Sequence, residues 1–437
     1  MSIYRAYDIR GKVPSELDGP RAYKIALAYS SLFKPKRVVI GMDGRKHSKM
    51  LHDAMVKGLR DMGVNVTSVS LCTTPLLYYA GSYFDGSVMI TASHLNGSFN
   101  GIKLGKKNNI PLSGKHGIYA IQKLVEKGDF SLSKRRGTYA ERYFVKRYHS
   151  FISKFARKTD LKVIVDCSYG MALNDLPLLK RIAEVEAINT KMDFHKKGHI
   201  PDPLKKNTRK KLEAAVKRKN ADIGIIFDGD CDRVCFVDGK GRFIAPDHVT
   251  GIIAEYLLRR SKRKGEPIVY EVRTTKAVPE MVKILDGKPF LAAAGRTFVR
   301  EKLLKRGGLF GGEKSGHYFF RSTHYADNAL LAAVLMLRYL DESGQTLEEL
   351  DAPFSKYAQL PETNFRVKNK DKTIAAVERK FRRAKIRKID GISVYLEDGW
   401  FNLRKSNTEP LIRLNAEADT RQALKKMKDE LIRIING

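Results

Sequence analysis

The segment Ala221-Asp222-Ile223-Gly224-Ile225-Ile226-Phe227 runs directly into Asp228-Gly229-Asp230-Cys231-Asp232-Arg233. A short apolar run of this length is typical of a buried strand, and the polar stretch after it is typical of the loop at the strand's end. Open α/β sheets present their ligand-binding residues at the carboxyl ends of strands. The segment therefore predicts an α/β fold with a functional loop at residues 228–233.

The loop contains three aspartates at alternate positions. Asp228, Asp230 and Asp232 point the same way on an extended chain, so their carboxylates converge. Like charges this close repel and raise each other's pKa unless a cation neutralises them. Hard oxygen ligands favour Mg²⁺ or Ca²⁺. An EF-hand calcium loop is excluded, because it needs glycine where Arg233 stands and glutamate where Gly239 stands.

Two further apolar runs end in polar loops in the same way. Residues 87–90 precede Thr91-Ala92-Ser93-His94, and residues 308–310 precede the glycine-flanked loop 311–317. Each of the three runs also has an earlier strand-like partner, at residues 37–40, 162–165 and 267–270 respectively. Strands that alternate with helical periodicity are typical of α/β architecture, so the sequence predicts three related α/β units.

The last part of the chain has a different pattern. Strand-like segments at residues 391–396, 400–403 and 411–414 precede a closing helix that begins near Thr420, a suitable N-cap residue. This order predicts a smaller α+β domain. Linker-like stretches near residues 135–137, 245–246 and 351–353 divide the chain into four expected domains. The domains are 1–136 with the loop at Ser93, 137–245 with the aspartate loop, 246–353 with the loop 311–317 and 354–437 with the loop 404–410.

Composition excludes several classes of protein. With 437 residues and 43% hydrophobic residues, the chain has ample material for packed cores and is not a disordered protein. The longest purely apolar run, residues 329–337, is far shorter than the ~20 residues that span a bilayer. The first residues lack the apolar core of a signal peptide. Four scattered cysteines indicate neither a disulfide framework nor a zinc site. We expect a soluble, reduced, cytoplasmic protein with no membrane partner.

Charge is the unusual bulk property, because 82 Lys and Arg residues against 48 Asp and Glu residues give a formal net charge of +34. Such a charge is compatible with an anionic substrate, a nucleic-acid partner or a solvated basic surface. The sequence shows neither the interleaved aromatic and basic residues of an RNA-binding sheet nor zinc-finger spacing. We therefore expect no specific nucleic-acid partner.

The serine loop contains groups suited to phosphate chemistry. Ser93 follows a strand, His94 is adjacent, and Lys103 supplies a cation that can act as an acid or base if its pKa is lowered. A serine in this position is more often a turn or cap residue, and its neighbours are what favour a functional role. No G-x-S-x-G motif surrounds Ser93, which argues against an α/β-hydrolase nucleophile.

Two more loops contain groups that recognise polar ligands. The loop 311–317 is not a P-loop, since Glu313 separates Gly312 from Lys314. What remains is a set of hydrogen-bonding side chains suited to a polyol or its phosphate, namely Glu313, Ser315 and His317. The stretch Arg404-Lys405-Ser406-Asn407-Thr408-Glu409-Pro410, together with Arg413, has the arginine and hydroxyl donors that suit a phosphate dianion.

Taken together, the four loops resemble those of the α-D-phosphohexomutases, specifically the phosphomannomutase/phosphoglucomutase branch. The resemblance covers essentially the whole chain and keeps the family's order of motifs, which begins at Tyr7-Asp8-Ile9-Arg10-Gly11 and includes His199-Ile200-Pro201-Asp202-Pro203. It implies three similar mixed-sheet α/β domains and a smaller C-terminal α+β domain around a central cleft.

The resemblance also implies a role for each loop. Ser93 would be a phosphoserine, and one Mg²⁺ per subunit would be held by Asp228, Asp230 and Asp232 with the serine phosphate as a further ligand. Arg10, Lys103 and Arg233 match positions near the transferring group, Lys103 is the candidate general acid/base, and His94 is grouped with the catalytic residues. Glu313, Ser315 and His317 would contact the sugar, and Arg404, Ser406, Asn407, Thr408 and Arg413 would hold the phosphate that is not transferred.

The implied reaction interconverts hexose 1-phosphate and hexose 6-phosphate through a hexose 1,6-bisphosphate, which also serves as activator. Asn407 favours mannose or glucose phosphate over glucosamine phosphate, because phosphoglucosamine mutases usually have glycine there. A phosphoglucosamine mutase is thus the alternative. A basic anion- or nucleic-acid-binding protein on an inactive mutase scaffold is the alternative from another class, and a metal-dependent phosphatase is a third. The implied partner is a phosphorylated hexose, and the chain is either a monomer or a homo-oligomer.

The sequence departs from the family pattern in the serine loop. The family commonly continues Ser-His-Asn-Pro, whereas Ser93-His94 is followed here by Leu95-Asn96. Loss of the proline predicts a looser loop, since proline restricts the conformations of the chain. Leu95 also removes a polar side chain from the neighbourhood of the serine.

Overall fold

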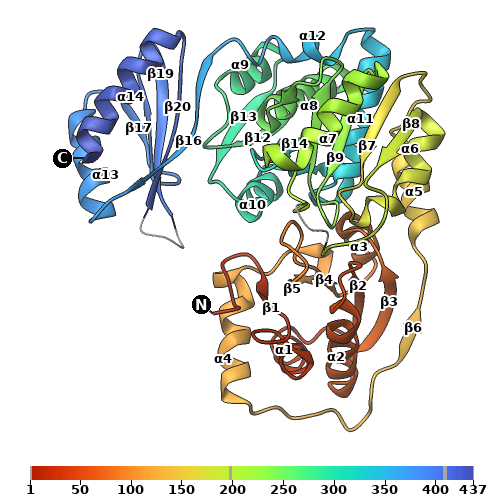
Figure 1. The fold of residues 1–437 in the computed structure, drawn as a ribbon. Helices are drawn as coiled ribbons and strands as arrows, with labels where there is room; N and C mark the ends of the chain where they lie inside the picture. The colour runs from red at the N-terminus through yellow and green to blue at the C-terminus, as the bar shows by residue number, and fades with distance from the viewer. Residues whose placement is uncertain (1, 196–198, 407–410, 437) are drawn as a thin grey trace. The chain divides into compact units, whose positions relative to one another are not determined.

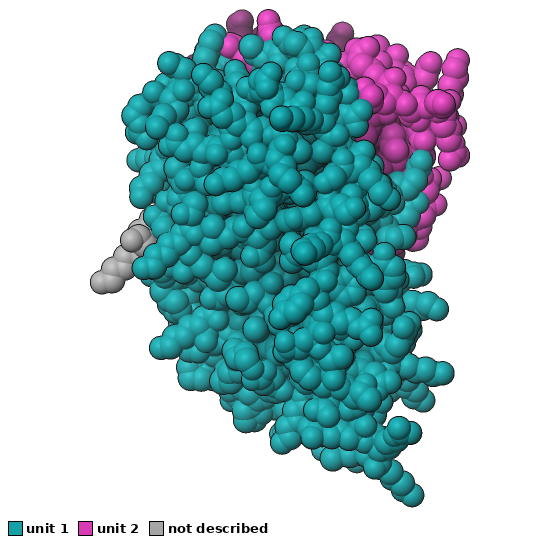
Figure 2. All heavy atoms as spheres, turned by 90° about the vertical axis from the view of Figure 1, so that its right-hand side faces the viewer, with its two compact units in different colours: residues 1–244, 315–347 teal, residues 245–314, 348–437 magenta. Residues whose placement is uncertain are grey.

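The computed structural model describes residues 2–195, 199–406 and 411–436. The chain divides into two compact units, one formed by residues 1–244 and 315–347 and the other by residues 245–314 and 348–437 (Figure 2). Figure 1 labels the helices and strands in chain order. Within the described residues, no helix is long and apolar enough to cross a membrane.

The first unit begins with a six-stranded sheet in the order β1-β5-β4-β2-β3-β6. Its strands are β1 (Ile9–Lys12), β2 (Arg37–Met42), β3 (Asn65–Leu71), β4 (Gly86–Ile90), β5 (Phe99–Lys106) and β6 (Tyr139–Glu141). Its helices are α1 (Gly19–Phe33), α2 (Ser48–Asp61), α3 (Thr74–Gly81) and α4 (Tyr119–Lys127), and α1 packs against α2 (Figure 1). The N-cap Asp18 accepts from the Arg21 amide and Pro20 fits the first turn of α1, which explains where this helix begins.

The second sheet has the order β11-β10-β9-β7-β8. Its strands are β7 (Lys162–Asp166), β8 (Glu184–Ile188), β9 (Ile223–Phe227), β10 (Val234–Asp238) and β11 (Phe243–Ile244). The helices of this part are α5 (Val145–Ser153), α6 (Leu176–Ile182) and α7 (Lys206–Lys219). All five residues of β9 are buried, as the apolar run in the sequence predicts. The first unit also includes β15 (Tyr318–Phe320) and α11 (Ala329–Ser343), and Asn328 caps α11 by accepting from the Leu331 amide.

The second unit contains a parallel group of strands and an antiparallel sheet. The parallel strands are β12 (Pro267–Glu271), β13 (Lys288–Ala292) and β14 (Phe310–Gly312), accompanied by α8 (Pro246–Arg260), α9 (Ala277–Ile284) and α10 (Arg296–Arg306). The antiparallel sheet has the order β16-β20-β19-β18-β17. Its strands are β16 (Ala358–Arg366), β17 (Lys385–Arg387), β18 (Ile392–Tyr395), β19 (Gly399–Lys405) and β20 (Leu411–Ala418), and its helices are α13 (Lys370–Lys380) and α14 (Arg421–Asn436). The short helix α12 (Leu347–Asp351) precedes them.

The predicted strand pairs are confirmed. β2 and β4, β7 and β9, and β12 and β14 are hydrogen-bonded parallel neighbours, so each apolar run lies beside the earlier strand assigned to it. β4 then pairs antiparallel with β5, and β9 pairs antiparallel with β10. The serine loop and the aspartate loop therefore occupy equivalent places, where the chain leaves a central parallel strand and turns back into an antiparallel one.

The C-terminal prediction is also confirmed. Thr420 accepts from the Ala423 amide through its hydroxyl oxygen and from the Leu424 amide through its carbonyl, and α14 begins at the next residue. One apolar core underlies this antiparallel sheet, in which Phe401, Leu414 and Leu431 are fully buried. All four cysteines are buried thiols without a disulfide, as expected from their spacing.

Candidate active site

Ser93 lies just beyond the end of β4 and is almost fully buried. Its backbone is left-handed, with φ 52°, and its amide donates to the Thr91 hydroxyl oxygen at 2.9 Å. Its own hydroxyl donates to Asp228 Oδ2 at 2.6 Å. A non-glycine residue with this φ is uncommon and persists only where the surroundings enforce it. The turn thus fixes the Ser93 hydroxyl against the aspartate loop of the neighbouring sheet.

The three aspartates converge as the sequence predicts. Ligand oxygens of Asp228, Asp230 and Asp232 all lie within 4.8 Å of one another, and all three side chains are buried. Burial raises the pKa of Asp228 well above its usual range, and the charges of Asp232 and Asp230 raise it further. Amides of Asp232 and Arg233 donate to Asp228 Oδ1 at 3.1 and 3.2 Å and so hold this carboxylate in place.

Lys103 supplies positive charge to the same cluster. Its Nζ, projecting from β5, lies 2.6 Å from Asp230 Oδ2 and 2.5 Å from Asp232 Oδ2. Thr74, the first residue of α3, donates its hydroxyl to Asp230 Oδ2 at 2.7 Å and its amide to the Asp230 carbonyl at 2.9 Å. The cluster is therefore anchored from both sheets of the first unit.

The donor set fits a divalent cation. Three buried carboxylates are the hard oxygen ligands that Mg²⁺ takes in proteins. Asp230 Oδ1 is buried and has no hydrogen-bond partner among the described residues, so one oxygen is still available to a ligand. Lys103 offsets part of the negative charge of Asp230 and Asp232. These features fit the metal site that the sequence predicts.

Arg233 and His317 extend the cluster within the first unit. Arg233 Nε lies 3.1 Å from His317 Nε2, and His317 Nδ1 lies 3.1 Å from the Asp232 carbonyl oxygen. Asp327 stands 2.9 Å from the same Nδ1 and pairs with the buried imidazole. The structure thus brings His317 of the predicted sugar loop to the aspartate loop.

Arg10 and His94 lie at the serine. Arg10 pairs with Asp8 at 2.6 Å and donates to the Ala92 carbonyl at 3.4 Å. His94 Nδ1 is 3.3 Å from Ser93 Oγ. Burial lowers the pKa of His94 well below its usual range, and Arg233 and Arg10 lower it further, so the imidazole is neutral at physiological pH.

A buried arginine that the sequence analysis does not single out holds the serine loop. The guanidinium of Arg45, from the loop after β2, donates to the carbonyl oxygens of Ser93, Leu95, Asn96 and Phe99 at 2.8, 2.8, 2.7 and 3.1 Å. Asp43 pairs with Arg45 Nε at 2.8 Å, and both side chains are fully buried. The loop that lacks the family's proline is therefore held by hydrogen bonds to its main chain.

Phe194 covers the Arg45 guanidinium, with 4.5 Å between Cζ and the ring centroid.

A Cβ on Gly229 would meet the Ser93 carbonyl oxygen at 2.4 Å, so the aspartate loop and the serine loop touch through their backbones. This close approach requires glycine at position 229.

The predicted sugar loop lies across the boundary between the units. Glu313 and Lys314 belong to the second unit, and Ser315 and His317 belong to the first. Within the described residues, neither Glu313 Oε2 nor Ser315 Oγ has a hydrogen-bond partner, although both atoms are buried. Buried acceptors and hydroxyls of this kind suit a ligand with several hydroxyl groups.

The predicted phosphate loop is partly described. Arg404 of β19 and Arg413 of β20 are directly opposite each other, and Glu362 lies 2.8 and 3.4 Å from their guanidinium groups. Burial alone would raise the pKa of Glu362, but Arg404 and Arg273 outweigh it and hold the pKa below its usual value. In the described part of the chain, Nε of both opposed arginines is buried without a hydrogen-bond partner. Ser406 follows β19, whereas Asn407 and Thr408 lie outside the described residues.

Family models match the chain in four consecutive parts. They are described as phosphoglucomutase/phosphomannomutase alpha/beta/alpha domain I over residues 1–132, domain II over 141–241, domain III over 245–357, and the C-terminal domain over 362–434. A phosphomannomutase from Methanocaldococcus jannaschii is 34% identical over 442 residues, covering 100% of this chain and 98% of that protein.

Solved structures agree with this match. A phosphoglucomutase/phosphomannomutase family protein from Burkholderia thailandensis has a TM-score of 0.91 at 30% identity, covering 99% of this chain and 96% of that chain. An Aspergillus fumigatus N-acetylphosphoglucosamine mutase in complex with GlcNAc-6P and magnesium has a TM-score of 0.61 at 15% identity, covering 99% and 94%. At that identity the second likeness concerns the fold alone.

Proposed function

The chain belongs to the phosphoglucomutase/phosphomannomutase family and is a phosphohexomutase, and from this premise we propose that Ser93 carries the phosphoryl group. The observation that supports this most directly is the buried Ser93 hydroxyl, held at 2.6 Å from Asp228 in the acidic triad. The Ser93 backbone is left-handed there, with φ 52°. The proposed substrates are mannose and glucose phosphates.

The proposed reaction has two phosphoryl transfers. In the first, the bond between phosphorus and Ser93 Oγ breaks while a bond forms from phosphorus to a free hydroxyl oxygen of the bound hexose phosphate. The hydroxyl proton is removed, and Ser93 Oγ gains a proton, so the product is a hexose 1,6-bisphosphate and an unmodified serine. The bisphosphate then turns around, and its other phosphoryl group is transferred to Ser93 by the reverse step.

The chain's own residues would position and neutralise the reacting groups, which phosphoryl transfer needs more than covalent assistance. Lys103 is the proposed acid/base, since its Nζ projects into the cluster and is shielded from solvent. His94, kept neutral, can accept a hydrogen bond beside Ser93 Oγ. Arg10, which donates to the Ala92 carbonyl, and Arg233, which lies 3.9 Å from Asp228, would supply positive charge near the serine.

Asp228, Asp230 and Asp232 would hold one Mg²⁺ per subunit, with the phosphate on Ser93 as a further ligand. Mg²⁺ would act there as a Lewis acid that stabilises negative charge on the transferring group. Asp230 Oδ1, which is buried without a hydrogen-bond partner among the described residues, supports this assignment.

Residues of the other two loops would hold the substrate. We assign the sugar hydroxyls to Glu313, Ser315 and His317, and the phosphate that is not transferred to Arg404, Ser406, Asn407, Thr408 and Arg413. Arg404 and Arg413, whose Nε donors have no hydrogen-bond partner within residues 2–195, 199–406 and 411–436, support the second assignment, because arginine suits bidentate contacts with phosphate. Asn407 favours mannose or glucose phosphate over glucosamine phosphate. We also propose that the four domains are separated by boundaries near residues 136, 245 and 353.

The test is a coupled assay on mannose, glucose and glucosamine phosphates with Mg²⁺ and hexose 1,6-bisphosphate as activator. We expect turnover of the mannose or glucose compound to exceed that of the glucosamine compound. Ser93→Ala is expected to reduce turnover to background, whereas Ser98→Ala, an exposed serine of the same loop, is the matched control. Mass spectrometry should locate a phosphate on the peptide that contains Ser93. Wild-type turnover by Ser93→Ala would exclude the proposal.

A further inference from the structure

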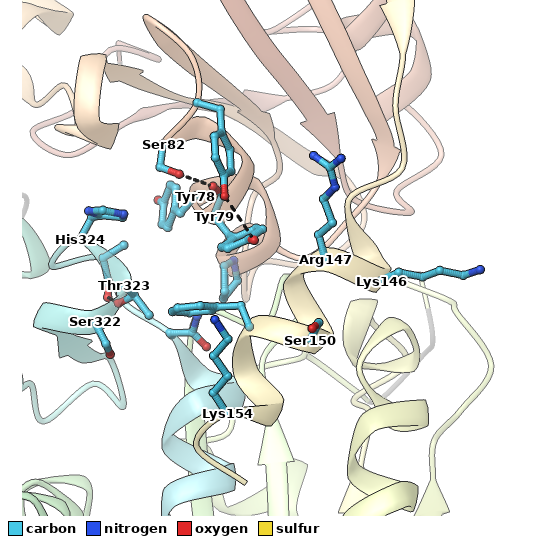
Figure 3. Close-up of a pocket in the computed structure, with 15 residues that line it drawn as sticks. Tyr78, Tyr79, Ser82, Lys146, Arg147, Ser150, Lys154, Ser322, Thr323 and His324 are labelled. Atoms are coloured by element: carbon cyan, nitrogen blue, oxygen red, sulfur yellow. Dashed lines mark hydrogen bonds between the residues drawn. The ribbon is translucent and has the colours of Figure 1, made fainter.

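The pocket in the first unit between α3, α5 and residues 322–328 is lined by aromatic rings that already pack on one another (Figure 3). Tyr79 stacks on Phe151 with 5.3 Å between ring centroids and meets Tyr83 edge-on at 5.9 Å. Nothing among its described lining residues selects one class of ligand. The antiparallel sheet of the second unit is different, because it places a carboxylate against arginines whose buried donors are unused.

Glu362 is this carboxylate, and it lies inside the proposed phosphate site. Its oxygens are 2.8 Å from Arg404 Nη2 and 3.4 Å from Arg413 Nη1. Burial would raise the pKa of Glu362, but Arg404 and Arg273 outweigh it and hold the pKa below its usual value, so the group is ionised at neutral pH. A negative charge at this position opposes the binding of a phosphate, and the proposed reaction does not explain why it is there.

A bulge in β16 places Glu362 beside the two arginines. The pairing of β16 with β20 shifts between Leu360 and Thr363, so that Pro361 and Glu362 stand opposite the single residue Asn415. Proline has no N–H for the ladder and is found in sheets at edges and bulges. Bulges redirect side chains and are common beside active sites. Asn415 Nδ2 lies 3.3 Å from Glu362 Oε2 and contacts the carboxylate from the neighbouring strand.

The contact differs from one that braces an arginine elsewhere in this protein. Asp43 accepts from Nε of Arg45 at 2.8 Å and leaves the terminal nitrogens of that guanidinium to donate to the serine loop. Glu362 does the reverse, because it contacts terminal nitrogens of Arg404 and Arg413, while Nε of both is buried without a partner in the described part of the chain. Glu362 therefore occupies donors that a bidentate phosphate would use.

Arg273 gives this carboxylate a second cationic partner. Its Nη1 lies 3.6 Å from Glu362 Oε2, and its Nε donates to the fully buried Glu271 at 2.8 Å. Glu271 therefore holds the guanidinium of Arg273 independently of Glu362. When a phosphate takes the two opposed arginines, Glu362 still has a positive charge beside it, so its displacement does not leave an uncompensated carboxylate.

We propose that Glu362 is a built-in competitor of substrate phosphate and limits how tightly Arg404 and Arg413 hold a hexose phosphate. This inference rests on the proposed assignment of these arginines to the phosphate that is not transferred. In the proposed reaction the bisphosphate turns around, so the site has to release one phosphoryl group and accept the other within each cycle. A carboxylate that returns to the arginines as phosphate leaves weakens the grip, and uniformly tighter binding would not raise kcat.

The test is a calorimetric titration of the full-length Ser93→Ala protein, which cannot turn over, with mannose 6-phosphate and with glucose 6-phosphate. Adding Glu362→Gln should lower the Kd of the compound that binds by about tenfold, because a like charge beside the phosphate is removed. Glu362→Ala, a second variant without the charge, should also lower Kd. Glu378→Gln is the matched control, because it removes the same charge from the same antiparallel domain but from a glutamate paired with Lys388. It should leave Kd within about twofold.

Arg404→Gln in the same background separates the competitor from the phosphate site on which it depends. This variant should raise Kd at least about tenfold through loss of charge-assisted contacts. If it does so while Glu362→Gln leaves Kd unchanged or raises it, the carboxylate orients the arginines and the competitor is excluded, but the proposed function stands. An unchanged Kd in Arg404→Gln, or no binding of either compound, would overturn the phosphate site and the competitor together.

Kinetics provide a second readout, which a purely structural role would not move in this direction. With Ser93 intact, Glu362→Gln should lower the KM for hexose phosphate without raising kcat. A higher KM, or a higher kcat at unchanged KM, would overturn the inference. Thermal unfolding of each variant checks that it is folded, which the 28% exposure of the Glu362 side chain favours.

Discussion

Arg45→Lys tests whether the guanidinium of Arg45 holds the serine loop in its reactive conformation. The substitution keeps the positive charge beside Asp43 but replaces a planar fork with a single ammonium group. Arginine reaches four loop carbonyls and Asp43, whereas the three N–H donors of lysine can serve Asp43 and two carbonyls. At least two carbonyl contacts are therefore lost.

The magnitude follows from those contacts. A hydrogen bond from a charged group contributes about 1.5 kcal/mol at the low end, so two of them favour the observed loop conformation by about 3 kcal/mol. If the whole of this free energy supports the reactive geometry, its loss lowers kcat by about a hundredfold; if half does, the loss is about tenfold. The KM for hexose phosphate should stay within about threefold, because the proposed phosphate-gripping arginines lie in other loops.

The assay is steady-state kinetics with Mg²⁺ and saturating hexose 1,6-bisphosphate, together with urea unfolding of both proteins. Arg242→Lys is the matched control, because Arg242 also pairs with an aspartate, Asp238 at 2.7 Å, but its side chain is 52% exposed. The control should keep wild-type kcat. Wild-type kcat in Arg45→Lys, or an equal loss in Arg242→Lys, would refute the reasoning.

Four further predictions concern other features of the molecule. Asp230→Ala should lower turnover far more than the free energy of unfolding, since its carboxylate would hold the proposed Mg²⁺ and repels its neighbours when the metal is absent; parallel losses in kinetics and urea unfolding would contradict this. Gly229→Ala should lower turnover by at least about tenfold, because the new Cβ would lie 2.4 Å from the Ser93 carbonyl oxygen, whereas Gly239→Ala, whose nearest neighbour is at 3.3 Å, should not. Burial raises the pKa of Asp166 to about 6, so the folded state binds this proton more tightly; stability from this group should rise by about 1 kcal/mol from pH 7 to pH 5, and unfolding of Asp166→Asn should lack that component. Duplex DNA should bind only weakly, without sequence preference and less as salt rises, as gel-shift titrations across salt concentrations can measure.

The strands, and the loops that carry candidate functional side chains, could be predicted because each has a pattern within one short stretch of sequence. An apolar run such as residues 223–227 indicates a buried strand by itself, and the alternating aspartates that follow indicate converging carboxylates. The resemblance then assigned roles to loops whose chemistry was already evident. The sequence also indicated that residues 162–165 form the strand-like partner of this run, and the structure pairs β7 with β9 in parallel.

Residues that act across long distances in the sequence could not be predicted in this way. Arg45 contacts main-chain carbonyls about fifty residues away, and a carbonyl group has no signature in the sequence. Thr74 looks like an ordinary helix-start residue until the structure brings it to Asp230. Asp327 likewise becomes a partner of His317 only through the fold. The prediction of a looser serine loop, which rested on Leu95 and Asn96, did not take into account the hydrogen bonds that Arg45 donates to the loop.

The restraint by Arg45 affects how freely the serine loop can change in evolution. Arg45 donates its hydrogen bonds to carbonyl oxygens, which every amino acid carries. The conformation of the loop backbone therefore depends little on which side chains stand at positions 95 and 96. Neutral drift at those two positions can therefore proceed while Ser93 stays in place. Selection would then act on Arg45 and Asp43, which lie in a different segment of the chain from Ser93, the proposed phosphoryl carrier.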